Sequence, residues 1–212
     1  MSILEQISEA TQAGKKNDVE LLVQQAIDEG IPAERILDEG LVAGMGIIGD
    51  KFSNNEVFVP EMLMAARAMT AGTAILRPLL TQEGVAAKGK AVISTVKGDV
   101  HDIGKNLVRM MLEGKGIDVV DLGVDTSPDD IVSYIKEHDD LQLVCLSSLL
   151  TTSMAALEET VRKINGEGLK DRVKILIGGA PVTQEFADRI GADGYAPDAA
   201  SGAVRAMELL AG

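Results

Sequence analysis

The sequence predicts a helical bundle followed by an α/β domain with a parallel sheet. In residues 2–81, apolar side chains recur at helical spacing throughout. From residue 90 onward, short apolar runs of the strand type alternate with amphipathic helical segments, which is typical of a parallel sheet covered by helices on both faces. Residues 84–90 break both patterns. We therefore expect a helical cap domain at 1–83, a linker at 84–90 and an α/β domain at 91–212.

Capping signals predict four helices in the first part, joined by short connections. Ser2 with Glu5, and Asn17 with Glu20, have the spacing of a capping box, in which side chain and backbone amide satisfy each other reciprocally. Further signals are two glycines placed to end the first two helices and two prolines suited to the first turns of the next two: Gly14, Gly30, Pro32 and Pro60. Together they indicate a four-helix bundle.

The second part contains five predicted strands. We expect them near 91–96, 118–122, 142–147, 173–177 and 193–196. The helices between and after them are expected near 105–115, 128–138, 153–166, 183–190 and 199–211. Five strands in this alternation favour a flavodoxin-like, Rossmann-like order, whose ligand crevice lies beyond the carboxyl end of the first strand.

Composition excludes several classes of protein. A net charge of −13 argues against nucleic acid or an anionic membrane as a partner, since both require clustered Lys and Arg. No apolar stretch approaches the roughly 18 residues that span a bilayer, and no basic region followed by an apolar stretch indicates a signal peptide. Cys145 is the only cysteine and lies in an apolar run, which excludes an intrachain disulfide. We expect a cytoplasmic protein.

The loop that follows the first strand carries the strongest functional signal. Its residues 98–104 read Gly-Asp-Val-His-Asp-Ile-Gly and contain one of only two histidines. A histidine here, His101, lies where open α/β sheets place their ligands. Asp99, two residues earlier, is placed to hydrogen-bond the imidazole and fix its tautomer, as carboxylates do behind metal-bound histidines. The sequence therefore predicts a metal or cofactor clamp.

Two further loops are expected at the same edge of the sheet. One follows the third strand and contains Ser147, Leu149, Thr151 and Ser153, and the other follows the fourth strand at Gly178–Gly179. Small and hydroxyl-bearing residues permit close backbone approach and hydrogen bonding to a bulky ligand. The plainer alternative for each loop is that the hydroxyls cap the next helix and the glycines form a turn. The three loops together favour a ligand site.

The spacing of these loops resembles that of a cobalamin-binding domain, which carries Asp-x-His-x-x-Gly, then Ser-x-Leu, then Gly-Gly. Here 42 residues lie between Gly104 and Ser147, and 28 between Leu149 and Gly178. The helical part resembles the cap module of cobalamin-dependent methyl-transfer proteins through its motifs at 44–52 and 58–69. One departure is Ala43, where the methionine synthase module has a glutamate. In size and layout the chain is most similar to the small corrinoid proteins of methanol, methylamine, betaine and aromatic methyl ether methyltransferase systems.

This resemblance implies a corrinoid bound with its lower base displaced (base-off/His-on), with His101 as the ligand of cobalt. Asp99 would accept a hydrogen bond from the other ring nitrogen, and Ser153 would extend the relay to solvent. The metal would pass between Co(I) and methylcobalamin, a methyl-Co(III) state. The residues implied to contact the corrinoid are Gly98, Asp99, Val100, His101, Asp102, Ile103, Gly104, Ser147, Leu149, Thr151, Gly178, Gly179 and Ala199. Phe58 and Met62 would shield the upper face, with bundle core as the alternative role for both.

The resemblance further implies a methyl carrier that is not a complete catalyst alone. One methyltransferase would load it from a methylated substrate, a second would pass the methyl group to tetrahydrofolate or coenzyme M, and a reductive activase would restore Co(I). The main alternative is a cobalamin-dependent sensor, a class that normally adds a DNA-binding or signalling domain. A radical mutase subunit would typically lack the helical cap. Flavin binding would leave His101 unexplained and lacks aromatic residues in the loops to stack on the ring.

Overall fold

The computed structural model describes residues 1–82 and 87–211, and the chain divides into two compact units. One unit comprises Met1–Ala87 with Glu113–Gly116, and the other comprises Lys88–Leu112 with Ile117–Gly212. Residues 83–86, which include part of the predicted linker at 84–90, lie outside the described residues. The last two residues of that predicted linker belong to the first strand. No helix in the described ranges is long and apolar enough to cross a membrane.

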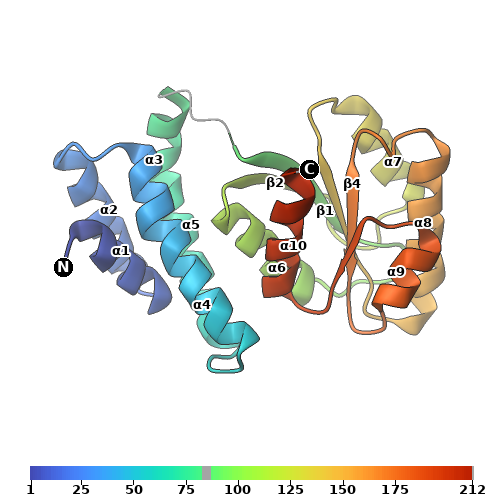
Figure 1. Ribbon diagram of the computed structural model, residues 1–212, viewed down its shortest axis with the longest axis horizontal. Helices are drawn as coiled ribbons and strands as arrows, with labels where there is room; N and C mark the ends of the chain where they lie inside the picture. The colour runs from blue at the N-terminus through green and yellow to red at the C-terminus, as the bar shows by residue number, and fades with distance from the viewer. Residues whose placement is uncertain (83–86, 212) are drawn as a thin grey trace. The chain divides into compact units, whose positions relative to one another are not determined.

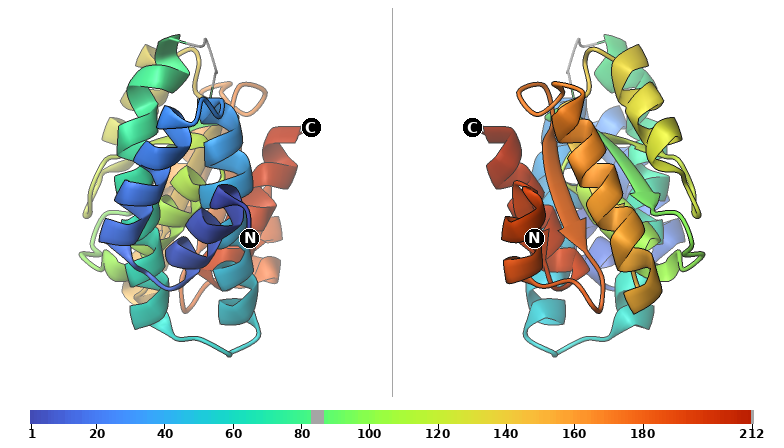
Figure 2. Two further views of the ribbon diagram at one scale, coloured as in Figure 1. Left: turned by 90° about the vertical axis from the view of Figure 1, so that its left-hand side faces the viewer. Right: turned by 90° about the vertical axis from the view of Figure 1, so that its right-hand side faces the viewer.

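The helical unit follows the predicted order of four helices. Its elements are α1 (Ile3–Gln12), α2 (Lys16–Asp28), α3 (Ala33–Arg35), the π-helical segment η1 (Ile36–Val42), α4 (Ala43–Ser53) and α5 (Val59–Gln82) (Figure 1). Because α3, η1 and α4 follow one another directly, they form the single third helix of the prediction. α2 and α5 pack along each other, and both also contact α1 (Figure 2, left). The buried side chains of the helical unit are mainly aliphatic and include Ile7, Val19, Val23, Ile36, Leu41 and Leu76.

The two predicted capping boxes have different outcomes. The first is confirmed: the Ser2 hydroxyl accepts a hydrogen bond from the Glu5 amide, and the Glu5 carboxylate accepts one from the Ser2 amide. The second is wrong. The left-handed turn at Gly14 leads directly into α2, which begins at Lys16, so Asn17 already lies inside the first turn and no side chain caps this helix.

The α/β unit contains a five-stranded parallel sheet. Its strands are β1 (Gly89–Thr95), β2 (Ile117–Asp121), β3 (Leu143–Ser147), β4 (Lys174–Gly178) and β5 (Gly194–Ala196). Its helices are α6 (Ile103–Gly114), α7 (Pro128–Glu137), the short 3₁₀ turn η2 (Thr151–Ser153), α8 (Met154–Gly166), α9 (Gln184–Ile190) and α10 (Ala199–Ala211). The strand order is β2-β1-β3-β4-β5, which confirms the predicted flavodoxin-like, doubly wound topology.

Helices cover both faces of this sheet (Figure 1). α6 and α10 lie on one face, and α7, α8 and α9 lie on the other. On the second face, alternate strand residues such as Val92, Val144 and Ile175 pack against Ile131 of α7 and Leu157 of α8 in one buried apolar cluster. The burial of apolar side chains on both faces explains why the strands are nearly continuous apolar runs.

The strand register brings the functional loops to one edge of the sheet. Thr95 at the end of β1 pairs with Ser147, Ser147 pairs with Gly178, and Gly178 pairs with Ala196. Four strands therefore end in a single row, and the loops that follow them begin side by side. The predicted gathering of the histidine, serine and glycine loops at this edge is confirmed.

Candidate functional site

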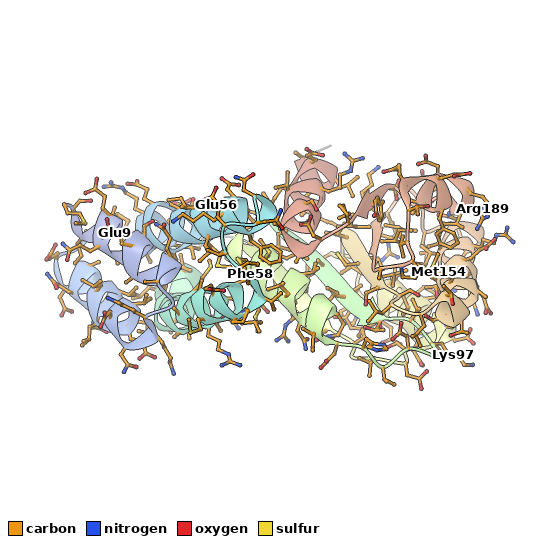
Figure 3. All side chains as sticks on the ribbon, turned by 90° about the horizontal axis from the view of Figure 1, so that it is seen from below. Glu9, Glu56, Phe58, Lys97, Met154 and Arg189 are labelled. Carbon is orange, nitrogen blue, oxygen red and sulfur yellow. The ribbon has the colours of Figure 1, made fainter. Side chains whose placement is uncertain are left out.

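The histidine loop joins β1 to α6 and turns sharply after the strand. Gly98 has φ +84°, a left-handed conformation that glycine adopts without steric cost, and the Asp99 amide donates to the carbonyl of Val96 at 3.2 Å. The turn buries the Asp99 side chain completely while leaving 48% of the His101 side chain exposed. In Figure 3, the label of Lys97 marks this loop and the label of Met154 marks the start of α8. The chain thus places an acid inside the protein and a base at its surface, two residues apart.

The Asp99 carboxylate is surrounded by hydrogen-bond donors. Oδ1 accepts from the backbone N–H of His101 at 3.0 Å and lies 2.7 Å from Nδ1 of the same residue. Oδ2 accepts from the amides of Leu149 at 2.6 Å and Leu150 at 3.2 Å, and from the Ser153 hydroxyl at 3.1 Å. The donors to Oδ2 come from a loop about fifty residues further along the chain. Asp99 therefore joins the first and second functional loops.

These contacts determine the charge of the site. Burial by itself would raise the pKa of the Asp99 carboxyl, but hydrogen bonds from His101, Leu149 and Ser153 outweigh it and lower the pKa to about 2. Asp99 is therefore a carboxylate at neutral pH. A carboxylate can only accept hydrogen bonds, so Nδ1 of His101 must carry the proton that it shares with Oδ1.

The tautomer of His101 follows from this pairing. In the neutral imidazole with a proton on Nδ1, the second nitrogen, Nε2, has a free lone pair. Within residues 1–82 and 87–211, no side chain or backbone group hydrogen-bonds to Nε2. The predicted fixing of the tautomer by Asp99 agrees with this geometry. In this neutral tautomer, His101 presents one unprotonated nitrogen, on an exposed ring, to any metal ion that arrives.

The predicted relay through Ser153 takes a different course from the one expected. Ser153 does hydrogen-bond to Asp99, but its side chain is buried and does not reach solvent. Its hydroxyl lies 2.7 Å from that of Ser148, which is also fully buried. The expected extension to solvent is therefore wrong, because η2 turns Ser153 inward under the loop. The hydrogen bonds run into the protein to Ser148, which sequence reasoning did not select, and from the Ser148 hydroxyl to the Leu150 carbonyl at 3.3 Å.

A second hydroxyl network supports the backbone of His101. The Thr95 hydroxyl donates to the His101 carbonyl at 2.8 Å and lies 2.9 Å from the Ser147 hydroxyl. Since Thr95 has one hydroxyl proton, and the carbonyl can only accept, Ser147 is the donor in the pair of hydroxyls. Thr95 was missed as a site residue because its pattern is that of a buried strand. The only available signal was its position as the last residue of β1.

The glycine loop after β4 lies directly against the serine loop. Gly179 has φ +127°, and a Cβ at this position would lie 1.9 Å from the carbonyl oxygen of Ser148. Only glycine permits this approach of two backbones. A Cβ at Gly178 would lie 3.0 Å from the Ala196 carbonyl. Gly179 thus permits the second and third loops to meet, and the Ser148 amide donates to the Gly178 carbonyl at 3.1 Å. Both glycines remain partly exposed to solvent.

Several apolar side chains in the histidine loop, and in the loop that follows β3, are exposed to solvent. Val100 is 69% exposed and Ile103 is 68% exposed, although both are large aliphatic residues, and Leu149 and Leu150 are also exposed. Such side chains in a row of loops indicate a surface that a ligand or partner covers. Of the other predicted contact residues, Asp102, Gly104 and Thr151 are exposed, and Ala199 is buried at the start of α10. The Asp102 carboxylate accepts a hydrogen bond from Asn106 at 3.1 Å.

The two residues predicted in the helical unit differ in exposure. Phe58, labelled in Figure 3, is 66% exposed immediately before α5. Met62 lies one turn further along and is fully buried. Burial agrees with the alternative role of Met62 in the bundle core. The assignment of Phe58 and Met62 as a shield for a ligand stays a prediction.

The residues of this site suit a metal ion that is held in a flat organic ring. His101 offers a metal one nitrogen, so the metal must bring its remaining ligands with it. Exposed aliphatic residues beside the imidazole suit the face of such a ring, and the glycine and serine loops permit close approach of its substituents. The buried carboxylate behind the imidazole is the usual support of a histidine that binds metal. These residues fit a corrinoid.

Comparisons with known proteins agree with this fit. Residues 89–204 and residues 3–77 each match a family model described as a B12 binding domain. The fold and the site therefore define a B12-binding protein with a helical N-terminal part. Over 210 residues the chain is 40% identical to the dimethylamine corrinoid protein of Methanosarcina barkeri, covering 99% of this chain and 98% of that one. The chain belongs to the family of corrinoid proteins of methyltransferase systems.

Two solved structures share its architecture across both units. A cobalamin-binding protein from Desulfitobacterium hafniense matches with a TM-score of 0.82 and 30% identity, over 97% of this chain and 98% of that one. A chain of the methanol:cobalamin methyltransferase complex from Methanosarcina barkeri matches with a TM-score of 0.85 and 30% identity, over 99% of this chain and 80% of that one. The predicted combination of a helical bundle with a Rossmann-like domain is confirmed.

Proposed function

We propose that this chain binds a corrinoid and carries methyl groups between two methyltransferases. The observation that carries the proposal is the 2.7 Å contact between Asp99 and Nδ1 of His101, which leaves Nε2 of an exposed imidazole free to bind a metal. Membership of a family of corrinoid proteins over almost the full length supports it.

The proposed mode of binding is base-off/His-on, in which His101 replaces the lower base of the corrinoid as the axial ligand. Val100, Ile103 and Leu149 would contact the ring, because they are exposed aliphatic residues next to the imidazole in sequence or at the sheet edge. The displaced nucleotide tail would lie among the loops that end the central strands. The residues proposed for it are Ser147, Thr151, Gly178, Gly179 and Ala199.

When bound, the corrinoid supplies a cobalt ion that takes up and releases a methyl group. The protein's own contribution lies beneath the ring. Asp99 remains ionised and holds the imidazole in one orientation. Because the backbone amides of Leu149 and Leu150 anchor the same carboxylate, the protein itself fixes the orientation in which His101 would meet the metal. The helical unit, through Phe58, would shield the opposite face.

The proposed partners follow from the family. A substrate:corrinoid methyltransferase loads the carrier, a second methyltransferase passes the methyl group to tetrahydrofolate or coenzyme M, and a reductive activase restores the reactive state. The relative at 40% identity is named for dimethylamine, whereas the chain from the methanol system is 30% identical. We therefore propose a methylated amine as the methyl donor. A lone buried thiol fits a reducing compartment, and we propose the cytoplasm.

Reconstitution tests the binding mode. The purified protein is labelled with ¹⁵N-histidine and mixed with hydroxocobalamin, and the cobalt is reduced chemically by one electron to paramagnetic Co(II). Its visible and electron paramagnetic resonance spectra are compared with those of His101→Ala treated in the same way. We expect the wild type to retain cobalamin and to show the two-line ¹⁵N hyperfine coupling of a labelled imidazole, and the variant to lack that coupling. Identical spectra from the two proteins would refute the assignment of His101.

A transfer assay tests the function itself. The reduced holoprotein is supplied with monomethylamine, dimethylamine or methanol, each with its own methyltransferase, and methylation is followed by absorbance. We expect transfer from one of the amines, with an amine methyltransferase as the partner. Failure with every donor, by a protein that binds cobalamin normally, would refute methyl carriage and leave the binding site intact.

A further inference from the structure

The loop between β2 and α7 lies against the histidine loop, although none of the motifs includes it. The Thr95 amide donates to the Gly123 carbonyl at 3.0 Å, and the Thr126 amide donates to the Thr95 carbonyl at 3.1 Å. These bonds continue the pairing of β1 with β2 beyond the end of the strands. Asp125, one of the two residues between Gly123 and Thr126, is therefore held beside the turn that begins at Gly98.

Asp125 contacts the histidine loop with both its side chain and its backbone. Its Oδ1 accepts a hydrogen bond from the Gly98 amide at 2.7 Å, and its own amide donates to the Asp99 carbonyl at 2.9 Å. Its backbone has φ +52°, an uncommon conformation for a residue other than glycine, although aspartate tolerates it better than most. One residue from a neighbouring loop thus holds both ends of the Gly98–Asp99 segment.

We propose that Asp125 is a positioning residue that keeps Asp99 aligned with His101. Gly98 has the least restricted backbone in the loop, because it lacks a Cβ and has φ +84°. Rotation about its bonds would move the Asp99 carboxylate away from Nδ1 of His101. The two hydrogen bonds of Asp125 oppose that rotation from both sides. The purpose of the alignment, to present Nε2 to cobalt, rests on the proposed function, whereas the alignment itself does not.

Two substitutions of Asp125 and one control substitution separate the effect of its side-chain hydrogen bond from the effect of its backbone conformation. Asp125→Asn keeps an oxygen that can accept from Gly98 and tolerates the left-handed backbone. Asp125→Gly removes the acceptor but suits the backbone better than aspartate does, so it tests the side-chain contact without added strain. Asp171→Gly is the matched control, because Asp171 is an exposed aspartate in the turn before β4. Thermal unfolding of all three confirms that they are folded.

Nuclear magnetic resonance of the apoprotein provides the readout. We expect Asp125→Gly to speed amide hydrogen exchange at Gly98 about fivefold to tenfold and to shift the ring ¹⁵N signals of His101 from one tautomer toward a mixture. Asp125→Asn and Asp171→Gly should match the wild type in both measurements. Unchanged His101 signals in Asp125→Gly would overturn the proposal, as would an Asp125→Asn variant that behaves like Asp125→Gly.

Binding of hydroxocobalamin provides a second, separate arm. We expect Asp125→Gly to bind several-fold more weakly than the wild type and to show a smaller fraction with imidazole bound to cobalt, with recovery in Asp125→Asn. Equal affinity and equal ligation in Asp125→Gly would overturn the link between alignment and cobalt binding. A wild-type protein that binds no cobalamin would instead refute the proposed function, and the measurements on the apoprotein would still decide the role of Asp125.

Discussion

The Asp99 carboxylate lies 2.7 Å from Nδ1 of His101 and is completely buried, whereas the imidazole is half exposed. A charge without solvent is stable only when donors surround it, and backbone amides of Leu149 and Leu150 supply two of those donors. The acid thus orients the histidine from inside the protein.

Replacing Asp99 by asparagine should destabilise the protein strongly. Backbone amides donate to both carboxylate oxygens, so the NH₂ group of asparagine would meet a backbone donor on whichever side it turned. We expect a loss of about 2–4 kcal/mol in the free energy of unfolding, measured by denaturation in urea. Asp102→Asn, at an exposed position, should cost less than about 0.5 kcal/mol. Equal stability of Asp99→Asn and the wild type would contradict the donor arrangement.

Stability should depend on pH through the same carboxyl. The pKa of Asp99 is lowered from 3.8 to about 2 in the folded protein, so the folded state favours the ionised form. The resulting stabilisation, about 2 kcal/mol, is fully present above pH 4 and is lost as the pH falls toward 2. Unfolding free energies measured at intervals between pH 6 and 2 should show this loss. The difference between wild type and Asp99→Asn should shrink over the same interval, and a constant difference would refute the shift.

Gly179→Ala should be far more costly than alanine at another left-handed glycine. A Cβ at Gly179 would lie 1.9 Å from the Ser148 carbonyl, so the serine and glycine loops would have to separate. Gly168 also has positive φ, +73°, but has open space around it. We expect a loss of about 3 kcal/mol or more for Gly179→Ala and about 1 kcal/mol for Gly168→Ala in thermal or urea unfolding. Similar losses in the two variants would show that backbone strain alone limits both positions.

The thiol of Cys145 should be inert in the folded protein. Burial within β3 raises its pKa to about 12, so almost no thiolate forms at pH 8. We expect no reaction with a disulfide reagent such as dithionitrobenzoate under native conditions and full reaction in denaturant. Rapid reaction of the native protein would indicate that β3 opens readily.

Much of this architecture can be predicted from local sequence. The Ser2 capping box, the glycines that end α1 and α2, and the alternation of strands with helices depend on residues close together in the chain, and these predictions are confirmed. The spacing of His101, Ser147 and Gly179 also predicted which loops share an edge. The predictions failed where one local signal competed with another, as at Asn17, where the turn at Gly14 starts the helix earlier than the capping pattern indicates.

The sequence by itself determined the order of the elements, the strand topology and the position of an exposed histidine at the sheet edge, because those features follow from periodicity and from short motifs. Only the tertiary structure decided which atoms hold that histidine. The pairing of Thr95 with Ser147 brings Leu149 and Ser153 to Asp99, and the continued pairing of β1 with β2 brings Asp125 to Gly98. These partners lie roughly 25 to 55 residues apart in the chain. Their hydrogen bonds exist because the strands align in one register, which no local pattern contains.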